Sequence, residues 1–510
     1  METSQRVDHL AGLITIAAIN VTVLHFCLTF VPAVIAPGAF AHYSAEIWIN
    51  KTIVPFFLNQ GALGLFFTTS ARFLITPFLH DGDLSSISSK IVSRVFQIML
   101  PVLIFALLEY FLILSGATYY LPFLPSITWS TWPYVIPFPH IGYLLNEVIA
   151  LAYTIPNAVP LITFNYCTGV LWTIPVIIQG SWTTLLAILL ITSIPTPKKR
   201  FPFYVFSLLI NWYSLSWSSF FWVGILLTDL EVTYHMPRYL HKYPLIYYPL
   251  ILTLTILALL ALSADTFNQW LDYSIIAKET LIHPDPSTGL PATITHNSGY
   301  PGYPGYWVPH FNGLIFCTAI QCLASISPLV QSFLSAKHLM LLFPHVFSMY
   351  LFHGMIFWSL GSWVCLTLNN ILPYWAVLIV TAVVCYTVLF LSLPMLSLIA
   401  GLFGKGLAGD IKRDSREEPL KGRPTLTPFG RDWLNRNGMI DGIPVVTVEA
   451  STEVNKVEKT DTERKGTDGV KIRVIECDEE VGGDSIASSA DKVDRLGSAD
   501  GEAEDQISKG

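Results

Sequence analysis

The first 403 residues of this 510-residue chain contain very few charged side chains. Of the 29 Lys and Arg and 36 Asp and Glu in the chain, only 12 Lys or Arg and 13 Asp or Glu precede position 404. Soluble domains usually carry charge on about a quarter of their residues, so this body lacks a polar surface that could face water. The net charge is −7, of which residues 404–510 contribute −6 (17 basic against 23 acidic residues), and this excludes nucleic acid as a partner.

Cysteine pairs of the kind that form disulfide bonds in secreted domains or bind zinc are also missing. None of the seven cysteines forms a CxxC pair or a zinc-ligand spacing. Cys167 lies at the edge of an apolar run and Cys477 lies in the polar tail. The other five lie inside apolar runs: Cys27, Cys317, Cys322, Cys365 and Cys385. The pattern excludes a disulfide scaffold and predicts no metal site.

Long apolar runs are what the sequence has in abundance, since 52% of its residues are hydrophobic and the mean hydropathy is +0.53. A membrane crossing takes about 20 apolar residues. The run 202–229 is long and least apolar at 211–214, so we interpret it as two short spans in a hairpin. The sequence therefore predicts an all-α polytopic membrane protein with about ten transmembrane helices, near residues 10–36, 54–77, 95–115, 167–194, 202–229 (two), 245–264, 311–333, 343–366 and 373–402.

The distribution of basic residues favours ten spans with both termini in the cytosol. In that topology only Lys51 and Lys278 fall on the outer side, whereas a single span at 202–229 would invert everything after it. Nine other basic residues of the body then lie at or near the cytosolic side: Arg6, Lys90, Arg94, Lys198, Lys199, Arg200, Arg238, Lys242 and Lys337.

Three segments differ from the apolar spans. Residues 116–166 include a half-apolar stretch, 141–163, that is typical of a re-entrant or interfacial element. Residues 265–310 contain the aromatic Pro-Gly repeat YPGYPGYW, which favours an interfacial loop. Residues 404–510 are polar and of mixed charge, so we expect a membrane domain over 1–403 and a disordered cytosolic tail over 404–510, with partners that the sequence does not identify.

Ionisable side chains inside spans are costly and point to function. His25 lies near the middle of the first predicted span, after Asn20, and His353 lies in a late span. A buried neutral imidazole is the usual general base for a hydroxyl. A histidine that merely bonds a neighbouring helix explains the position equally well.

Three cations gather at the predicted cytosolic ends of the second and third spans. Arg72, Lys90 and Arg94 are expected to lie close together, where they could bind a phosphate-bearing ligand. For any one of them alone, ordinary snorkelling of a basic side chain is the simpler explanation.

Five short motifs follow one another along residues 6–400. They are Arg6 with Leu10, Gly12, Leu13 and VLHF at 23–26; GALGLFFTTSARFLI at 61–75; RVFQIMLP at 94–101; LWTIPV at 171–176 followed by Gly180-Ser181; and YLFHG at 350–354. In this order they resemble motifs of the acyltransferase 3 family: an LDGLRG-type turn with a histidine ending the first helix, an FF…SGFLI helix, a basic segment entering Leu-Pro, the LWTIPVEFRGS signature of the fungal branch, and YLxHG.

The resemblance implies a ten-helix membrane enzyme that moves an acyl group from acyl-CoA to a hydroxyl acceptor. Acyl-CoA would be a co-substrate entering from the cytosol, with no further cofactor, and the acceptor would be a sugar, a lipid or a secondary metabolite. His25 would be the base, and Arg72, Lys90 and Arg94 would hold CoA. The supporting residues would be Asn20, Trp172 and His353. The compartment would be an endomembrane or the plasma membrane.

Several motif positions depart from the family pattern. In the first motif, Ala11 and Ile14 replace the Asp and Arg of LDGLRG. In the second and third, Ala71-Arg72 departs from SGFLI and Gln97 replaces a second arginine. In the fourth, Ile177-Ile178-Gln179 replaces the Glu-Phe-Arg that follows WTIPV. Ile14 and Ile177 form a matched loss of an Arg and a Glu, if the two positions lie close together. The alternative function is a catalytically inactive relative that acts as a transporter, scaffold or sensor.

Overall fold

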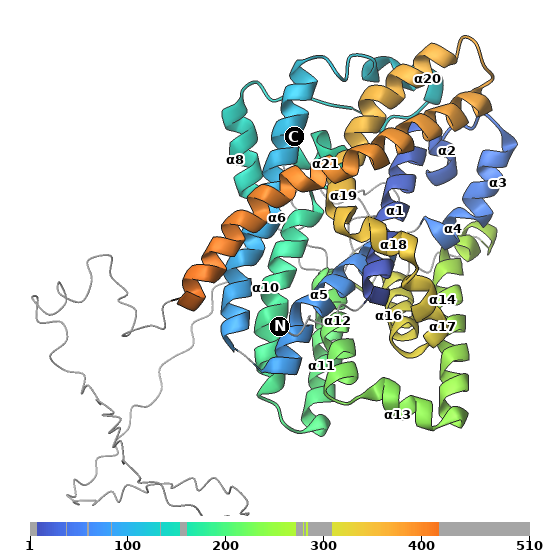
Figure 1. Cartoon of the computed structure of the whole chain (residues 1–510). Helices are drawn as coiled ribbons and strands as arrows, with labels where there is room; N and C mark the ends of the chain where they lie inside the picture. The colour runs from blue at the N-terminus through green and yellow to red at the C-terminus, as the bar shows by residue number, and fades with distance from the viewer. Residues whose placement is uncertain are drawn as a thin grey trace, which may run out of the picture. The chain divides into compact units, whose positions relative to one another are not determined.

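The computed structural model describes residues 8–36, 38–58, 61–82, 84–132, 134–153, 161–271, 279, 282–283 and 309–417. Within these residues every regular element is a helix, which confirms the all-α fold class (Figure 1). Apolar runs form helices because a helix satisfies its backbone hydrogen bonds within one segment.

Long helices alternate with short helical turns along the chain. The first half contains α1 (Asp8–Phe30), α2 (Pro32–Ile35), α3 (Ser44–Thr52), α4 (Val54–Phe57), α5 (Gly61–Asp81), α6 (Leu84–Leu114), η1 (Leu121–Phe123), α7 (Pro125–Thr128), α8 (Ile141–Leu151), α9 (Leu161–Asn165), η2 (Cys167–Gly169), α10 (Thr173–Thr192), α11 (Pro197–Tyr213) and α12 (Ser218–Val232). The second half contains α13 (Met236–Lys242), α14 (Pro244–Leu271), α16 (Phe311–Ile326), α17 (Pro328–Leu334), α18 (Lys337–Leu342), η4 (Phe343–His345), α19 (Val346–Ile356), the π-helical turn η5 (Phe357–Gly361), α20 (Ser362–Leu368) and α21 (Tyr374–Glu417).

Seven helical segments of the described chain are long and apolar enough to cross a membrane. An eighth is added if α16 and α17, which are bent by 98° at Ser327, count as one broken span. The predicted number of about ten crossings is therefore supported only in part. The seven segments are Asp8–Phe30, Val54–His80, Lys90–Leu114, Thr173–Thr192, Pro244–Ala264, Lys337–Leu368 and Tyr374–Gly401.

The run 202–229 folds as two helices, as the sequence predicted. α11 ends at Tyr213 and α12 begins at Ser218, with Leu215 at a φ of 54° in the turn between them. The helices have 17 and 15 residues, which is shorter than the usual length of a crossing. That these two helices cross the membrane stays a prediction.

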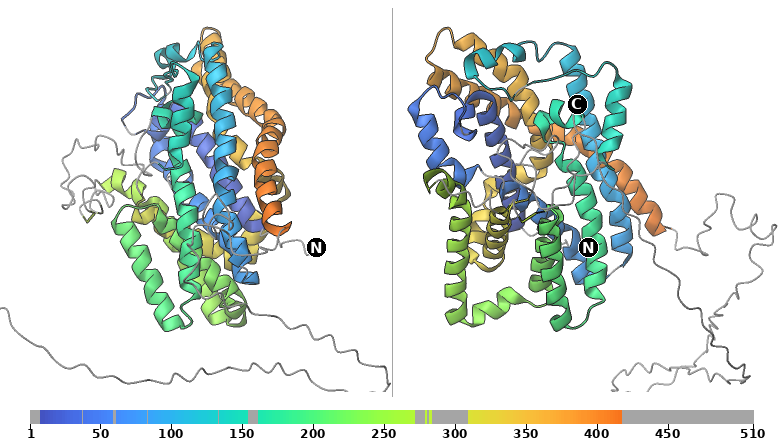
Figure 2. Two further views of the ribbon diagram at one scale, coloured as in Figure 1. Left: turned by 90° about the vertical axis from the view of Figure 1, so that its left-hand side faces the viewer. Right: turned by 180° about the vertical axis from the view of Figure 1, so that it is seen from behind.

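The core is built around α5, which packs against α1, α10, α12 and α16. Small residues allow this close approach. A Cβ on Gly224 of α12 would lie 2.7 Å from the backbone oxygen of Thr68, and one on Gly180 of α10 would lie 2.3 Å from the ring of Phe221. α6 and α10 lie side by side (Figure 2), and α21 packs across α6.

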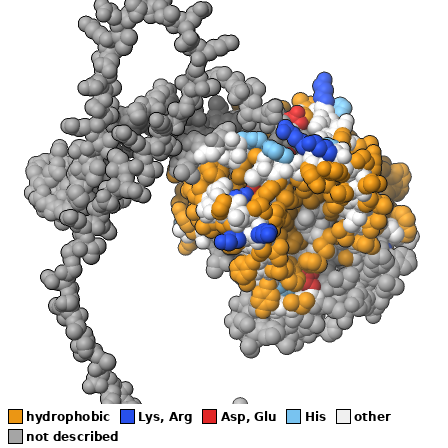
Figure 3. All heavy atoms as spheres, turned by 90° about the horizontal axis from the view of Figure 1, so that it is seen from below, with side chains coloured by type: hydrophobic (Ala, Val, Ile, Leu, Met, Phe, Trp, Pro, Cys, Tyr) orange, Lys and Arg blue, Asp and Glu red, His pale blue; other side chains and the backbone are white. Residues whose placement is uncertain are grey.

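The outer surface is apolar. Along α14, Leu245 is 92% exposed and Leu252 is 62% exposed. Seen from below, hydrophobic side chains cover much of the body, and Lys and Arg side chains lie among them (Figure 3). Such a surface is compatible with lipid rather than with water.

Two boundaries differ from those predicted. α1 ends at Phe30 instead of near residue 36, because Pro32 has no N–H with which to continue the helix. α21 continues past residue 403 to Glu417, so the change to a charged composition at Gly404 does not end the helix. The rest of the predicted tail, 418–510, and most of 265–310 lie outside the described residues. α8 is a short apolar helix within the stretch predicted to be re-entrant or interfacial.

Candidate active site

His25 lies on α1, five residues before the helix ends at Phe30. It was expected near the middle of its span. Because α1 stops earlier than predicted, the middle of the helix is residue 19, and His25 lies about 9 Å further toward the end opposite the N-terminus. The side chain is buried, with 8% of its surface exposed.

The structure brings His25 together with His353 of α19. The Nδ1 atom of His25 lies 2.8 Å from the Nε2 atom of His353, and the two rings stack with centroids 5.1 Å apart. His353 is fully buried, and its Nδ1 lies 3.1 Å from the carbonyl oxygen of Met349. Two candidates that the sequence placed 328 residues apart therefore form one hydrogen-bonded pair.

The hydrogen bonds of this pair fix where its protons lie. A carbonyl oxygen can only accept, so His353 must donate its Nδ1–H to Met349. In a neutral imidazole the other nitrogen then has a lone pair, so His353 Nε2 accepts the Nδ1–H of His25. The lone pair of His25 is left on Nε2, which is the atom that can take a proton from a hydroxyl.

Two segments from other parts of the chain lie beside the pair. The Trp132 ring lies with its centroid 5.9 Å from that of His25, and its segment is tied to the end of α1 by a 2.5 Å hydrogen bond from Ser130 Oγ to the Leu28 carbonyl. The second segment, η2, packs against α19. A Cβ on Gly354 would lie 1.0 Å from Thr168 Oγ1, so the glycine after His353 is what allows η2 to approach.

The η2 turn has an unusual backbone. Cys167, Thr168 and Gly169 have φ angles of 49°, 57° and 73°, a region that non-glycine residues seldom occupy. Glu109 of α6 holds the turn by accepting a 2.7 Å hydrogen bond from the Cys167 N–H, a partner that the sequence did not indicate.

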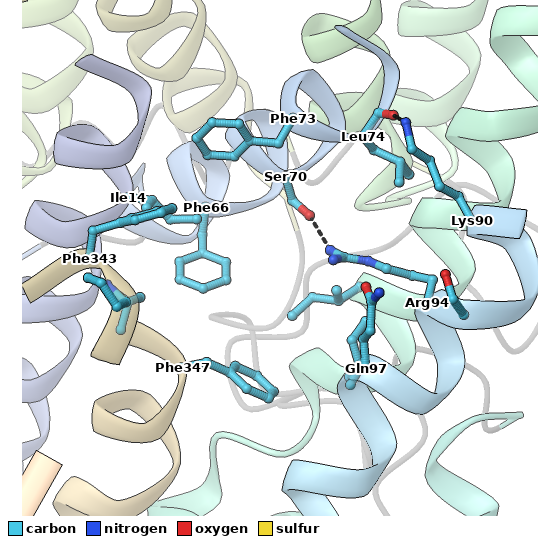
Figure 4. A pocket seen from close by; sticks show the side chains of 15 residues that line it. Ile14, Phe66, Ser70, Phe73, Leu74, Lys90, Arg94, Gln97, Phe343 and Phe347 are labelled. Atoms are coloured by element: carbon cyan, nitrogen blue, oxygen red, sulfur yellow. Dashed lines mark hydrogen bonds between the residues drawn. The ribbon is translucent and has the colours of Figure 1, made fainter. Parts of the chain in front are cut away.

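A separate cavity of about 450 Å³ lies among α1, α5, α6, α10 and α19. Figure 4 shows Arg94 extending toward it from α6, with Lys90 one turn away and a group of phenylalanine rings opposite. Arg94 donates to Ser70 Oγ at 2.8 Å and to Ser181 Oγ at 3.3 Å, and Lys90 donates to the Leu74 carbonyl at 2.9 Å. In the described part of the chain, no carboxylate pairs with Arg94.

Three of the altered motif positions line this same cavity. Ile14 of α1 and Ile177 of α10 are both in its wall, together with Gln97 of α6. The matched loss of an Arg and a Glu requires the two positions to be near each other, and their place in one cavity wall is compatible with it; the loss itself stays a prediction. The cavity keeps two cations and gains apolar surface in place of the charges of the family pattern.

The cavity and the histidine pair are connected by two helices. Along α1, Ile14 in the cavity wall precedes His25 by eleven residues, or about 16 Å. Along α19, Phe347 precedes His353 by six residues, or about 9 Å. Between them the Phe66 ring stacks on Tyr350 with centroids 5.7 Å apart.

Arg72 does not join Lys90 and Arg94 and is absent from the cavity wall. It is 1% exposed and forms an ion pair with Glu231 of α12. It also donates hydrogen bonds to Gln321 Oε1 at 2.7 Å and to Ser325 Oγ at 2.8 Å, both on α16. The expectation that the three cations share one ligand is wrong for Arg72, because its partners come from helices 159 and 249 residues away in the chain.

The other two supporting candidates also lie apart from the pair. The Trp172 ring packs in the core against Trp217 with centroids 5.4 Å apart. Asn20 is half-buried on α1, and five residues of helix rotate it by about 140° from His25. The described residues contain no group of three or more His, Cys, Asp or Glu that could hold a metal ion.

Sequence reasoning missed Trp132 and Thr168, which lie beside the pair. Gly354 gave the one available signal, since a glycine next to a candidate site can mark a close approach of another segment. The left-handed conformation of Thr168 left no trace in the sequence, because that residue type normally avoids it.

The two arginines should differ in what they do for stability. We expect Arg72→Met to lower the free energy of unfolding by about 3 kcal/mol, because it leaves Glu231 without its partner. Arg94→Met, which breaks no ion pair, should cost about 1 kcal/mol. Thermal unfolding of both variants in the same detergent checks this. Equal losses would contradict the structural role assigned to Arg72, and the double variant Arg72→Met/Glu231→Gln should recover most of the loss.

Comparison with known proteins identifies the family to which the chain belongs. The family model for the acyltransferase domain, Acyl_transf_3, matches residues 12–390, which is more than half of the chain. Comparison with curated proteins and with solved structures gives no match. The match spans the apolar helices, the histidine pair and the cavity, so this multi-pass membrane protein belongs to the acyltransferase 3 family.

Proposed function

We propose that this protein is a membrane O-acyltransferase that moves an acyl group from acyl-CoA to a hydroxyl acceptor, with His25 as the general base. The observation that carries the proposal is the buried bond between His25 Nδ1 and His353 Nε2, which leaves the lone pair of His25 on Nε2. Among apolar helices both rings are favoured in the uncharged form. An uncharged imidazole is the form that a base needs.

In the proposed reaction His25 Nε2 takes the proton of the acceptor hydroxyl as its oxygen attacks the thioester carbonyl carbon. A C–O bond forms and the carbonyl becomes a tetrahedral oxyanion. Collapse of that intermediate breaks the C–S bond and releases CoA as a thiolate, which receives the proton back from His25. The products are the ester and CoA.

His353 is a positioning residue in this reaction. While His25 carries the extra proton, its Nδ1–H remains bonded to His353 Nε2, which spreads the positive charge toward the Met349 carbonyl. A paired ring also holds His25 in one tautomer and one orientation. His353 would thus orient His25 in the same way as the third residue of a catalytic triad orients its histidine.

The cavity is suited to the donor. Lys90 and Arg94 are one helical turn apart on α6 and present two cations to a phosphate-bearing ligand. The distance of about 9–16 Å from the cavity to the histidines along α19 and α1 requires a donor with a long arm between its phosphates and its thioester. The pantetheine arm of acyl-CoA meets this requirement. We place the cavity at the cytosolic side, with both termini.

One observation favours a second candidate, a family member that acts without acyl transfer as a transporter, scaffold or sensor. The positions that depart from the family pattern, Ile14, Gln97 and Ile177, converge on the cavity that would hold the donor. A cavity changed in this way could have lost the ability to bind CoA.

The acceptor in the first candidate function, acyl transfer, would be a sugar, a lipid or a small secondary metabolite.

Replacing the base should abolish transfer. We expect His25→Ala to lower kcat by at least about 10²-fold, because a general base contributes 10²–10⁴-fold to such a step. The assay follows label from acetyl-CoA into a panel of sugars, lipids and small alcohols, using purified protein in nanodiscs. His345→Ala is the matched control, since that histidine bonds Ser397 outside the pair. Retained turnover in a folded His25→Ala protein would remove the central claim.

Charge reversal in the cavity should weaken donor binding. We expect Arg94→Glu to raise the Kd for acetyl-CoA by about tenfold or more, because it replaces a charge-assisted contact by repulsion. Arg238→Glu makes the same change on the exposed face of α13 and should leave the Kd unchanged. If folded, unchanged protein binds neither acetyl-CoA nor a longer acyl-CoA, the second candidate is the correct one.

A further inference from the structure

Two buried hydrogen-bond donors beside the histidine pair have no role in the reaction as described so far. Trp132 Nε1 and Thr168 Oγ1 are both buried and have no hydrogen-bond partner among the described residues. A buried polar atom without a partner typically costs about 1–3 kcal/mol. The described chain contains ten such atoms, but these two lie in the segments that pack beside His25 and His353.

The Trp132 ring and the η2 turn that carries Thr168 are in contact. The edge of the Trp132 indole lies 3.7 Å from the position that a Cβ on Gly169 would occupy, directly after Thr168. The Thr168 hydroxyl lies against Gly354, directly after His353, and the Trp132 ring lies 5.9 Å from that of His25. Both donors therefore lie on segments that pack directly against the pair.

The surrounding structure holds these donors in place at a cost in backbone conformational energy. Cys167 and Thr168 occupy left-handed conformations, each of which costs about 1–3 kcal/mol for a non-glycine residue. The Glu109 carboxylate fixes the first of them and the hydrogen bond from Ser130 to Leu28 fixes the segment that carries Trp132. Donors that are fixed in advance and lack a partner in the resting protein are what a developing negative charge requires.

We propose that Trp132 Nε1–H and Thr168 Oγ1–H form an oxyanion hole for the tetrahedral intermediate at the thioester carbonyl. The indole N–H can only donate, so its partner must be an oxygen with free lone pairs. The carbonyl oxygen gains negative charge when the acceptor oxygen bonds to carbon, and loses it when the C–S bond breaks. This inference rests on the proposed acyl transfer and adds the two residues that stabilise its transition state.

The test compares two CoA analogues, so it needs no knowledge of the acceptor. The trifluoromethyl ketone analogue of acetyl-CoA forms a hydrate with an oxygen where the oxyanion develops, whereas S-ethyl-CoA has none. We expect the unchanged protein to bind the ketone more tightly. Trp132→Phe and Thr168→Val should each reduce that preference by about tenfold and leave the Kd of S-ethyl-CoA unchanged.

Matched variants separate this role from a structural one. Thr168→Ser keeps the hydroxyl and should keep the preference. Thr381→Val removes a hydroxyl that is equally buried and without a partner in the described chain, but on α21, and should have no effect. Equal weakening of both analogues, or an unchanged preference in Trp132→Phe and Thr168→Val, would overturn the oxyanion hole while leaving the acyltransferase proposal standing. Failure of the unchanged protein to bind either analogue would overturn both.

Discussion

The hydrogen bond between His25 and His353 is the interaction on which the candidate site depends. It joins the first long helix to a late one across most of the chain, and its geometry fixes the tautomer of both rings. Three features of the fold lie next to this bond. Gly354 lets η2 approach, the π-helical turn η5 follows directly after α19, and the Trp132 ring lies beside that of His25. π-helical turns of this kind are frequent at functional sites.

The polar groups inside this apolar body divide into two kinds. Arg72 of α5 bonds both Glu231 of α12 and Gln321 of α16, and so holds three helices together. Arg94 instead bonds only neutral hydroxyls at the edge of a cavity. The difference lies in whether a carboxylate is near, and it is the reason why we propose a stabilising role for Arg72 and a binding role for Arg94.

Much of the fold could be predicted from the sequence, and less of the site. The apolar runs located the long helices, and the polar middle of 202–229 correctly separated α11 from α12. The helix ends were less predictable, because a single proline stops α1 whereas a charged segment does not stop α21. His25, His353, Lys90 and Arg94 could be chosen as candidates from their residue types alone. The pairing of Arg72 was not, because it depends on contacts between helices that no local pattern records.

The tautomer of His25 in the resting protein is the most direct test of its role as the base. Nitrogen NMR of ¹⁵N-histidine-labelled protein in nanodiscs, with His25→Gln and His353→Gln for assignment, reports which ring nitrogen carries the proton. We expect both rings to be neutral and protonated on Nδ1, with His25 Nε2 bare. A proton on His25 Nε2, or a permanent imidazolium, would contradict this role, because no lone pair would then be available to accept the proton of a hydroxyl.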